Sequence, residues 1–172
     1  MLTLQDLQSS TINPAVAREA FVQTDRYLVD TLAVRNSYEQ KAAPMMGAYI
    51  TISVALFGVG GAIFKDAAAP DRIWPFFATG LVFLLGAGCF IAAIKAGKYA
   101  AVGSTPEMWL APGVIDGDEN AVPAMLAYLT YYHQERIEIS IRSNRQKASW
   151  IDAGIILGAL APLTFLLLFL IL

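Results

Sequence analysis

Residues 143–172 close the chain and read SNRQKASWIDAGIILGALAPLTFLLLFLIL. Arg145 and Lys147 stand near the beginning of this stretch, Asp152 follows, and residues 153–172 carry no charge. A helix needs roughly 20 apolar residues to cross a bilayer core about 30 Å thick. The stretch is therefore long enough to form a membrane-spanning helix that enters from a polar, basic segment.

Two further uncharged runs cover residues 42–64 and 73–94. The segment that joins them, residues 65–72, is long enough only for a tight turn. The two runs are therefore expected to form an antiparallel transmembrane hairpin, and the chain to cross the membrane three times.

The composition supports a membrane protein. Of the 172 residues, 56% are hydrophobic and 15% are charged, whereas about 25% of the residues of a soluble domain are charged. With a net charge of −2, the chain has no overall positive potential that would attract nucleic acid, so no nucleic-acid partner is expected. Cys89 is the only cysteine, which excludes a disulfide framework within one chain.

Lysine and arginine are distributed unevenly along the chain. Ten of them precede the first run or lie between the second and third runs: Arg18, Arg26, Arg35, Lys41, Lys95, Lys98, Arg136, Arg142, Arg145 and Lys147. Only Lys65 and Arg72 lie in the hairpin turn. Because basic residues favour the cytoplasmic side, we expect a multi-pass protein of the cell inner membrane with a cytoplasmic N-terminus and an external C-terminus. Trp74 and Trp150 stand at span ends, where indole rings favour the headgroup zone.

The expected class is an all-α integral membrane protein with four parts. Residues 1–43 form a cytoplasmic amphipathic helix, 44–94 the hairpin, 95–148 a cytoplasmic loop and helix, and 149–172 the last span. Asn13 and Pro14 are a typical helix start, so a helix is expected over 14–42, which can continue into the first span through Pro44. From Pro123 onward the chain is expected to form one helix that ends in the last span.

The cytoplasmic part of that last helix carries a stripe that needs a partner surface. Its residues at helical spacing are Ile137, Ile141, Asn144 and Ala148. The helix over 14–41 is the natural partner, within one chain or across subunits, in a coiled-coil arrangement, although Arg35 interrupts its apolar stripe. Trp109, in a long loop rich in Gly, Pro and Asp, is a second partner-facing candidate; the alternative is that it packs on its own protein.

Asp152 is the one acid inside the frame of a span, and Lys41 lies at the same depth on the first span. The two are expected either to form a structural ion pair or, alternatively, to leave Asp152 solvated at the interface. Gly154 and Gly158 form a small-xxx-small pattern that allows helices to pack closely, either within the chain or between copies.

No catalytic, cofactor-binding or metal-binding residues are expected. His133 has no second histidine and no cysteine beside it. Residues 116–120 resemble the start of a calcium loop, but Ala121 and Ala127 occupy the positions that need Gly and Glu. An enzyme is therefore not expected, because no nucleophile with a nearby base and no phosphate-binding loop is found.

The segment VRNSYEQKAAPMMGAYITISVALFGV, residues 34–59, resembles the first span of small transmembrane effectors of bacterial anti-phage systems, the Pycsar and SLATT-like proteins. The resemblance is carried by Arg35, by residues 39–42 (EQKA), and by residues 144–147 before the last span. It implies an oligomeric membrane protein that perturbs the inner membrane when a cytoplasmic signal arrives.

Two functions follow as hypotheses. The first is a homo-oligomeric effector or channel-like protein in the lipid bilayer that couples a cytoplasmic signal to membrane perturbation. The second is a non-catalytic scaffold or accessory subunit that anchors a cytoplasmic protein partner through residues 99–148. The few hydroxyl groups along the spans, on Thr51, Ser53, Thr79 and Thr164, favour the second.

Overall fold

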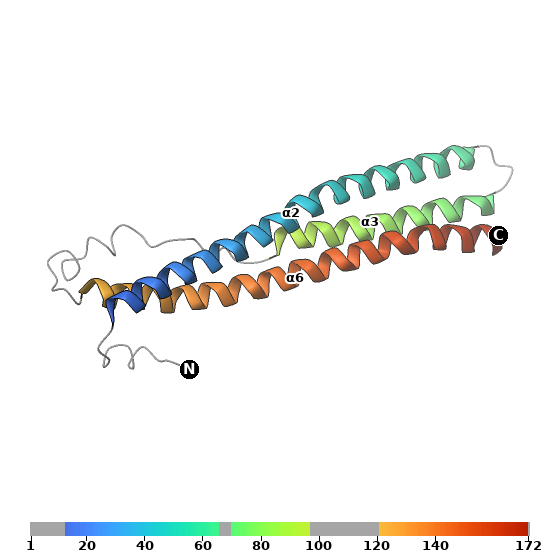
Figure 1. The fold of residues 1–172 in the computed structure, drawn as a ribbon. Helices are drawn as coiled ribbons and strands as arrows, with labels where there is room; N and C mark the ends of the chain where they lie inside the picture. Colours follow the sequence, from blue (N-terminus) through green and yellow to red (C-terminus); the bar gives the residue numbers. More distant parts are fainter. Residues whose placement is uncertain (1–12, 66–69, 97–120, 172) are drawn as a thin grey trace. The chain divides into compact units, whose positions relative to one another are not determined.

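A computed structural model describes residues 13–65, 70–96 and 121–171 (Figure 1). The described chain is helical and consists of α2 (Pro14–Lys65), the short 3-10 helix η1 (Pro70–Ile73), α3 (Trp74–Lys95) and α6 (Ala121–Ile171). Three of these helices are long and apolar enough to cross a membrane. The protein is therefore of the all-α membrane-associated class that the uncharged runs predict.

Helix α2 begins where the sequence indicates a cap. The Asn13 side-chain oxygen accepts hydrogen bonds from the backbone N–H groups of Ala15 and Val16, at 3.0 and 3.4 Å, which satisfies donors that a helix start leaves free. Pro44 lies inside the helix and removes one backbone donor. The helix continues past it to Lys65, so the expected continuation into the first apolar run is confirmed.

Helix α3 is bounded by Pro75 in its first turn and by extended backbone at Ala96, whose N–H donates to Ala92 O at 2.8 Å. Helix α6 contains both Pro123 and Pro162 and continues without a break through Trp150. A single helix that begins near Pro123 and ends in the last apolar run is therefore confirmed. The loop expected after Lys98 lies outside the described residues.

The chain divides into two compact units, each described separately. Unit 1 comprises Met1–Val34 and Lys98–Ser143, and unit 2 comprises Arg35–Gly97 and Asn144–Leu172. The unit boundaries fall inside α2 and α6, several residues before the positions 43/44 and 148/149 expected from the charge pattern. The difference arises because charge marks where a helix meets lipid, whereas packing marks which side chains share a core.

In unit 1 the buried side chains of α6 follow a seam with spacings of three and four residues: Leu129, His133, Ile137, Ser140 and Ser143. On α2, Leu28 and Thr31 are three residues apart and Ala17 lies eleven residues, or three turns, before Leu28. The rings of Phe21 and His133 pack with centroids 5.5 Å apart. This alternation is typical of a coiled-coil seam.

Unit 2 is a three-helix body held by contacts between aromatic rings and glycines. Tyr49 of α2 packs edge-on against Phe83 and Phe90 of α3. Further along, Phe57 packs on Phe77, with ring centroids 5.6 Å apart. Since rising numbers on α2 meet falling numbers on α3, these two helices are antiparallel. Around Ala42, Phe90, Ala93 and Ile151 the body has a buried apolar core.

Candidate functional site: a buried lysine at the end of α3

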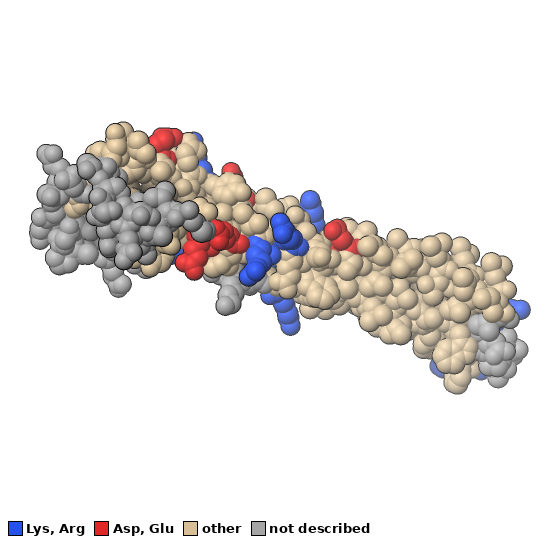
Figure 2. Space-filling view, turned by 90° about the horizontal axis from the view of Figure 1, so that it is seen from below, with Lys and Arg blue, Asp and Glu red and all other residues tan. Residues whose placement is uncertain are grey.

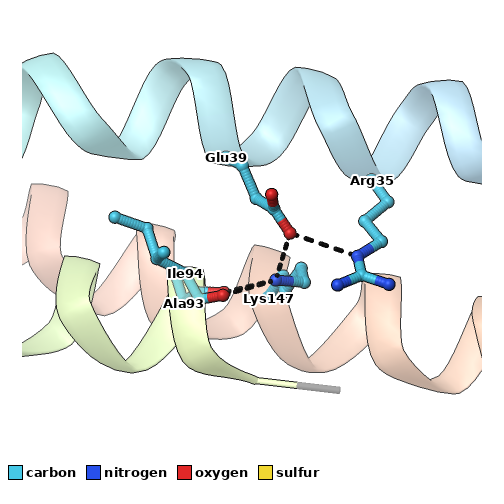
Figure 3. A network of polar contacts seen from close by, with 5 residues as sticks. All are labelled: Arg35, Glu39, Ala93, Ile94 and Lys147. Carbon is cyan, nitrogen blue, oxygen red and sulfur yellow. Dashed lines mark hydrogen bonds and ion pairs between the residues drawn. The ribbon is translucent and has the colours of Figure 1, made fainter. Parts of the chain in front are cut away.

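Lys147 is the charged side chain that unit 2 encloses completely, with 0% of its surface exposed. It extends from α6, and its Nζ donates to Glu39 Oε1 of α2 at 3.0 Å. The same Nζ donates to Ala93 O at 2.7 Å and Ile94 O at 3.2 Å on α3 (Figure 3). An ammonium group has three donors, so each donor of Lys147 has an acceptor, and one group connects all three helices.

The two backbone acceptors belong to the last turn of α3. The final carbonyls of a helix have no partner within the helix, and they form the negative end of its macrodipole. A cation placed there satisfies two of these carbonyls and interacts favourably with the dipole. Lys147 thus caps the C-terminus of α3 from a neighbouring helix.

Glu39 is shared between two cations. Its Oε1 accepts from Arg35 Nε at 3.1 Å, one turn earlier on α2, as well as from Lys147. Burial alone would raise the pKa of Glu39, but the hydrogen bonds from Lys147 and Arg35 outweigh it and lower the pKa below its ordinary value. The carboxyl is therefore ionised at neutral pH. We call Arg35, Glu39, Lys147 and the carbonyls of Ala93 and Ile94 the Lys147 cluster.

The Lys147 cluster has a structural role, because its hydrogen bonds and ion pairs join α2, α3 and α6. Removing one partner of a buried ion pair leaves an uncompensated charge, at a cost of about 3–5 kcal/mol. The arrangement therefore holds only while α2, α3 and α6 keep their register at this level. Among residues 13–65, 70–96 and 121–171, no three His, Cys, Asp or Glu side chains gather to hold a metal ion.

For Lys41 and Asp152 the sequence left two possibilities, an ion pair or an Asp152 solvated at the interface, and both residues are exposed. The ion pairs formed by the described residues join Glu39 to Lys147 and to Arg35, and neither includes Lys41 or Asp152. Successive helical residues are about 100° apart, so Lys41, two residues after Glu39, points to the opposite side of α2. Among the described residues, the ion pair between α2 and α6 is formed by Glu39 and Lys147.

Gly154 and Gly158 lie against aromatic rings of the other two helices. A Cβ atom on Gly154 would come within 2.8 Å of the Phe90 ring, and one on Gly158 would overlap the Tyr49 hydroxyl. Gly86 of α3 leaves room for the same Tyr49 ring, 2.8 Å from where its own Cβ would be. These glycines therefore form the surfaces on which the rings of α2 and α3 pack inside unit 2.

The partner-facing candidates fall in different places. Ile137 is buried in unit 1 and Asn144 in unit 2, whereas Ile141 is 37% exposed. Ile141 lies off the seam because the buried spacing from Ile137 continues by three residues to Ser140. Trp109 lies outside the described residues.

Sequence reasoning did not identify Glu39 and Lys147 as a pair, although a signal was present. On α6 the buried positions 140, 144, 147, 151 and 154 alternate between spacings of four and three. On α2, Arg35 continues the same alternation from Leu28 and Thr31 to Ala42. Arg35 is therefore a seam residue of α2, and its charge conceals the pattern when only apolar residues are considered.

Comparison of the chain with protein-family models, with curated proteins and with solved structures found no match.

Proposed function

We propose that this protein is a homo-oligomeric membrane effector, channel-like in action, that couples a cytoplasmic signal to a change in the membrane. The proposal includes a cytoplasmic N-terminus, an external C-terminus, a place in the cell inner membrane and no enzymatic activity. The observation that carries it is the Lys147 cluster, which fastens together three apolar helices, two of which are shared with unit 1.

The coupling rests on the continuity of α2 and α6. Each helix passes from one unit to the other without a chain break, so a rotation or axial shift imposed on unit 1 is transmitted through its backbone. Such a shift moves Lys147 away from the carbonyls of Ala93 and Ile94, because α3 belongs to unit 2 alone and does not move with unit 1. A buried charge that is either fully satisfied or not satisfied gives two discrete states, as a switch requires.

The exposed apolar surface supports self-association. In the most apolar windows of α2 and α6, 11% of the residues are buried, against 33% in α3. Gly47 and Gly58 of α2 have open space where a side chain would stand, which leaves a flat strip suited to close helix contact. Lipid and further copies of the chain are the natural neighbours of these surfaces. The resemblance of residues 34–59 to anti-phage effectors agrees with an oligomer that acts on the membrane.

Flux through liposomes tests the proposal. Purified protein reconstituted at increasing protein-to-lipid ratio should release a small trapped dye or dissipate an ion gradient. The Lys147→Met variant should change the flux severalfold, because the contacts that join the three helices are lost, whereas Arg142→Met, an exposed change five residues earlier on α6, should not. Mass measurement of the detergent-solubilised particle should show more than one copy. Tight vesicles for wild type and Lys147→Met alike would refute a channel-like action.

A second candidate, a non-conducting scaffold that anchors a cytoplasmic partner through residues 99–148, is favoured by one observation. All four hydroxyls expected along the spans donate to carbonyls of their own helices four residues earlier: Thr51 to Gly47 O, Ser53 to Tyr49 O, Thr79 to Pro75 O and Thr164 to Leu160 O. Hydroxyls satisfied in this way are poor lining for a wet pore. Cross-linking in native membranes should then recover one stoichiometric partner that a chain lacking residues 99–120 no longer captures.

A further inference from the structure

Three exposed cations stand outside the Lys147 cluster, one on each helix of unit 2. They are Lys41 on α2, Lys95 on α3 and Arg145 on α6. None of them takes part in the ion pairs formed by the described residues. We call this set the basic collar.

The collar residues share one level of unit 2. Lys95 directly follows Ile94, a carbonyl partner of Lys147, and lies two residues after the buried Ala93. Lys41 lies two residues after Glu39, and Arg145 lies two residues before Lys147. Two residues turn a helix by about 200°, so a residue two positions from an inward-facing one points outward. The three cations therefore point away from the common core and surround it, instead of converging on one point.

The surroundings of the basic collar are apolar on one side. Trp150, 40% exposed, lies nearby on α6, and the outward positions of the spans beyond it are large hydrophobic residues. Figure 2 shows a long stretch of tan surface with Lys and Arg side chains near each of its ends on the visible face. Asp152 is the exposed acid close to the collar, while Glu39 is engaged by Lys147. Among the described residues at this level of unit 2, three exposed cations thus stand beside one exposed acid.

The other end of the spans provides a comparison. Lys65 ends α2 and Arg72 lies in η1, and both are exposed. In the sequence, residues 65–72 carry two cations, Lys65 and Arg72, and two acids, so this segment has no net charge. Lys65 and Arg72 therefore provide a pair of exposed cations with which the collar can be compared.

We propose that the basic collar binds the headgroups of anionic phospholipids in the adjacent leaflet. Lysine is a compact charge and arginine a planar fork, and both bind phosphate oxygens. Because the collar residues lie around a perimeter, several lipids side by side match them, whereas one soluble anion cannot reach all three. The inference rests on the membrane-spanning part of the proposed function. Each Lys or Arg near a membrane surface strengthens binding to anionic lipid about fivefold.

The test compares the lipids retained by the full-length protein. Wild type, K41Q/K95Q/R145Q and the matched control K65Q/R72Q are reconstituted in bilayers of equal phosphatidylglycerol and phosphatidylcholine, then extracted and purified in a mild detergent. Retained lipids are counted by mass spectrometry, and circular dichroism verifies that each variant is helical. Lys95→Gln alone serves as a milder variant if the triple variant does not fold.

Wild type and K65Q/R72Q should retain phosphatidylglycerol in excess of phosphatidylcholine. Lys95→Gln should lower that excess about fivefold, and the triple variant should abolish it. Inorganic phosphate added at constant ionic strength should leave the excess unchanged. Three results would each contradict lipid binding by the collar. They are equal retention of the two lipids by wild type, a loss of the phosphatidylglycerol excess in K65Q/R72Q as large as in the triple variant, and a reduction of the excess by free phosphate.

The outcomes separate the collar from the proposed function. Lipid preference with tight vesicles would support the collar and refute a channel-like action. Leaky vesicles without lipid preference would support a channel-like action and refute lipid binding by the collar. Release of the native protein from membranes by alkaline carbonate would overturn both, since neither can hold for a protein that does not span the bilayer.

Discussion

Lys147 Nζ lies 3.0 Å from Glu39 Oε1, and this contact joins α6 to α2 at the point where α3 ends. The ammonium group is fully buried, whereas the Glu39 side chain keeps 32% of its surface exposed. The charge of Lys147 is therefore stabilised by one carboxylate and two carbonyls in place of water. Changes at this contact should affect three helices together.

Lys147→Met should destabilise unit 2 by about 1–3 kcal/mol, because the carbonyls of Ala93 and Ile94 lose their donor and Glu39 keeps only Arg35 as a partner. Arg142→Met, at an exposed site of the same helix, should change the stability by less than about 0.5 kcal/mol. Unfolding in mixed micelles with increasing sodium dodecyl sulfate, followed by circular dichroism, measures both. Equal midpoints for the two variants would contradict the role of Lys147.

Glu39 should make the stability of unit 2 depend on acidic pH. Its folded pKa is held below 4.5 by Lys147 and Arg35 against the effect of burial, so the ionised form is favoured in the fold. This contribution is fully present above about pH 4.5 and is lost as the pH falls through the lower folded pKa. The difference in unfolding midpoint between wild type and Glu39→Gln should shrink steadily across this range. A constant difference would show that Glu39 is not titrating there.

His133 should make unit 1 sensitive to mild acid. It is 1% exposed, and neither ring nitrogen has a hydrogen-bond partner among the described residues. Burial and the charge of Arg136 lower its pKa below 6.5, while Asp25 opposes them. The neutral form is therefore favoured in the fold, so stability is present above about pH 6.5 and is lost as the pH falls through the folded pKa.

His133→Leu should remove this dependence and stabilise unit 1 at neutral pH by about 1–2 kcal/mol, since two unsatisfied buried nitrogens disappear. Hydrogen exchange of residues 121–143, corrected for the intrinsic effect of pH, reports the change. Gln134→Leu, at the exposed neighbouring position, is the control. Protection in wild type that does not change between neutral and mildly acidic pH would contradict the prediction.

Gly158→Ala should destabilise unit 2 by about 1–3 kcal/mol through overpacking. The added Cβ would overlap the Tyr49 hydroxyl, and the ring cannot move freely because Gly86, Phe83 and Phe90 surround it. Gly88→Ala is the matched control on α3, because nothing lies within 4 Å of its Cβ position. Adding Tyr49→Ala to each variant completes a double-mutant cycle, and additive effects would rule out the contact.

The orientation predicted from the basic residues is tested by labelling. Single cysteines placed near residue 10 and near the C-terminus of a Cys89→Ala chain should react with a membrane-impermeant reagent from opposite sides of the membrane. The expected result is protection of the first and labelling of the second in intact cells, once an outer barrier is made permeable. Labelling of both from one side would require an even number of crossings.

The sequence by itself determined the helical class and the number of apolar helices long enough to span. Both follow from local properties: uncharged runs of sufficient length, Asn13 and Pro14 at a helix start, and the absence of strong breaks from residue 123 onward. Pro44 did not end its helix, as expected where neighbouring residues support the backbone, and Pro162 likewise lies inside α6. Such signals act over a few residues and can be read without knowledge of partners.

Only the tertiary structure decided which side chains meet. Lys41 and Glu39 lie two residues apart and both carry charge, yet only Glu39 faces the core, because a rotation of about 200° separates them. The acceptors of Lys147 on α3 are backbone carbonyls of Ala93 and Ile94, which no side-chain pattern reveals. The exposed Ile141 and the buried Lys147 show the same principle, since burial depends on helix register and on the end of a neighbouring helix more than on hydrophobicity.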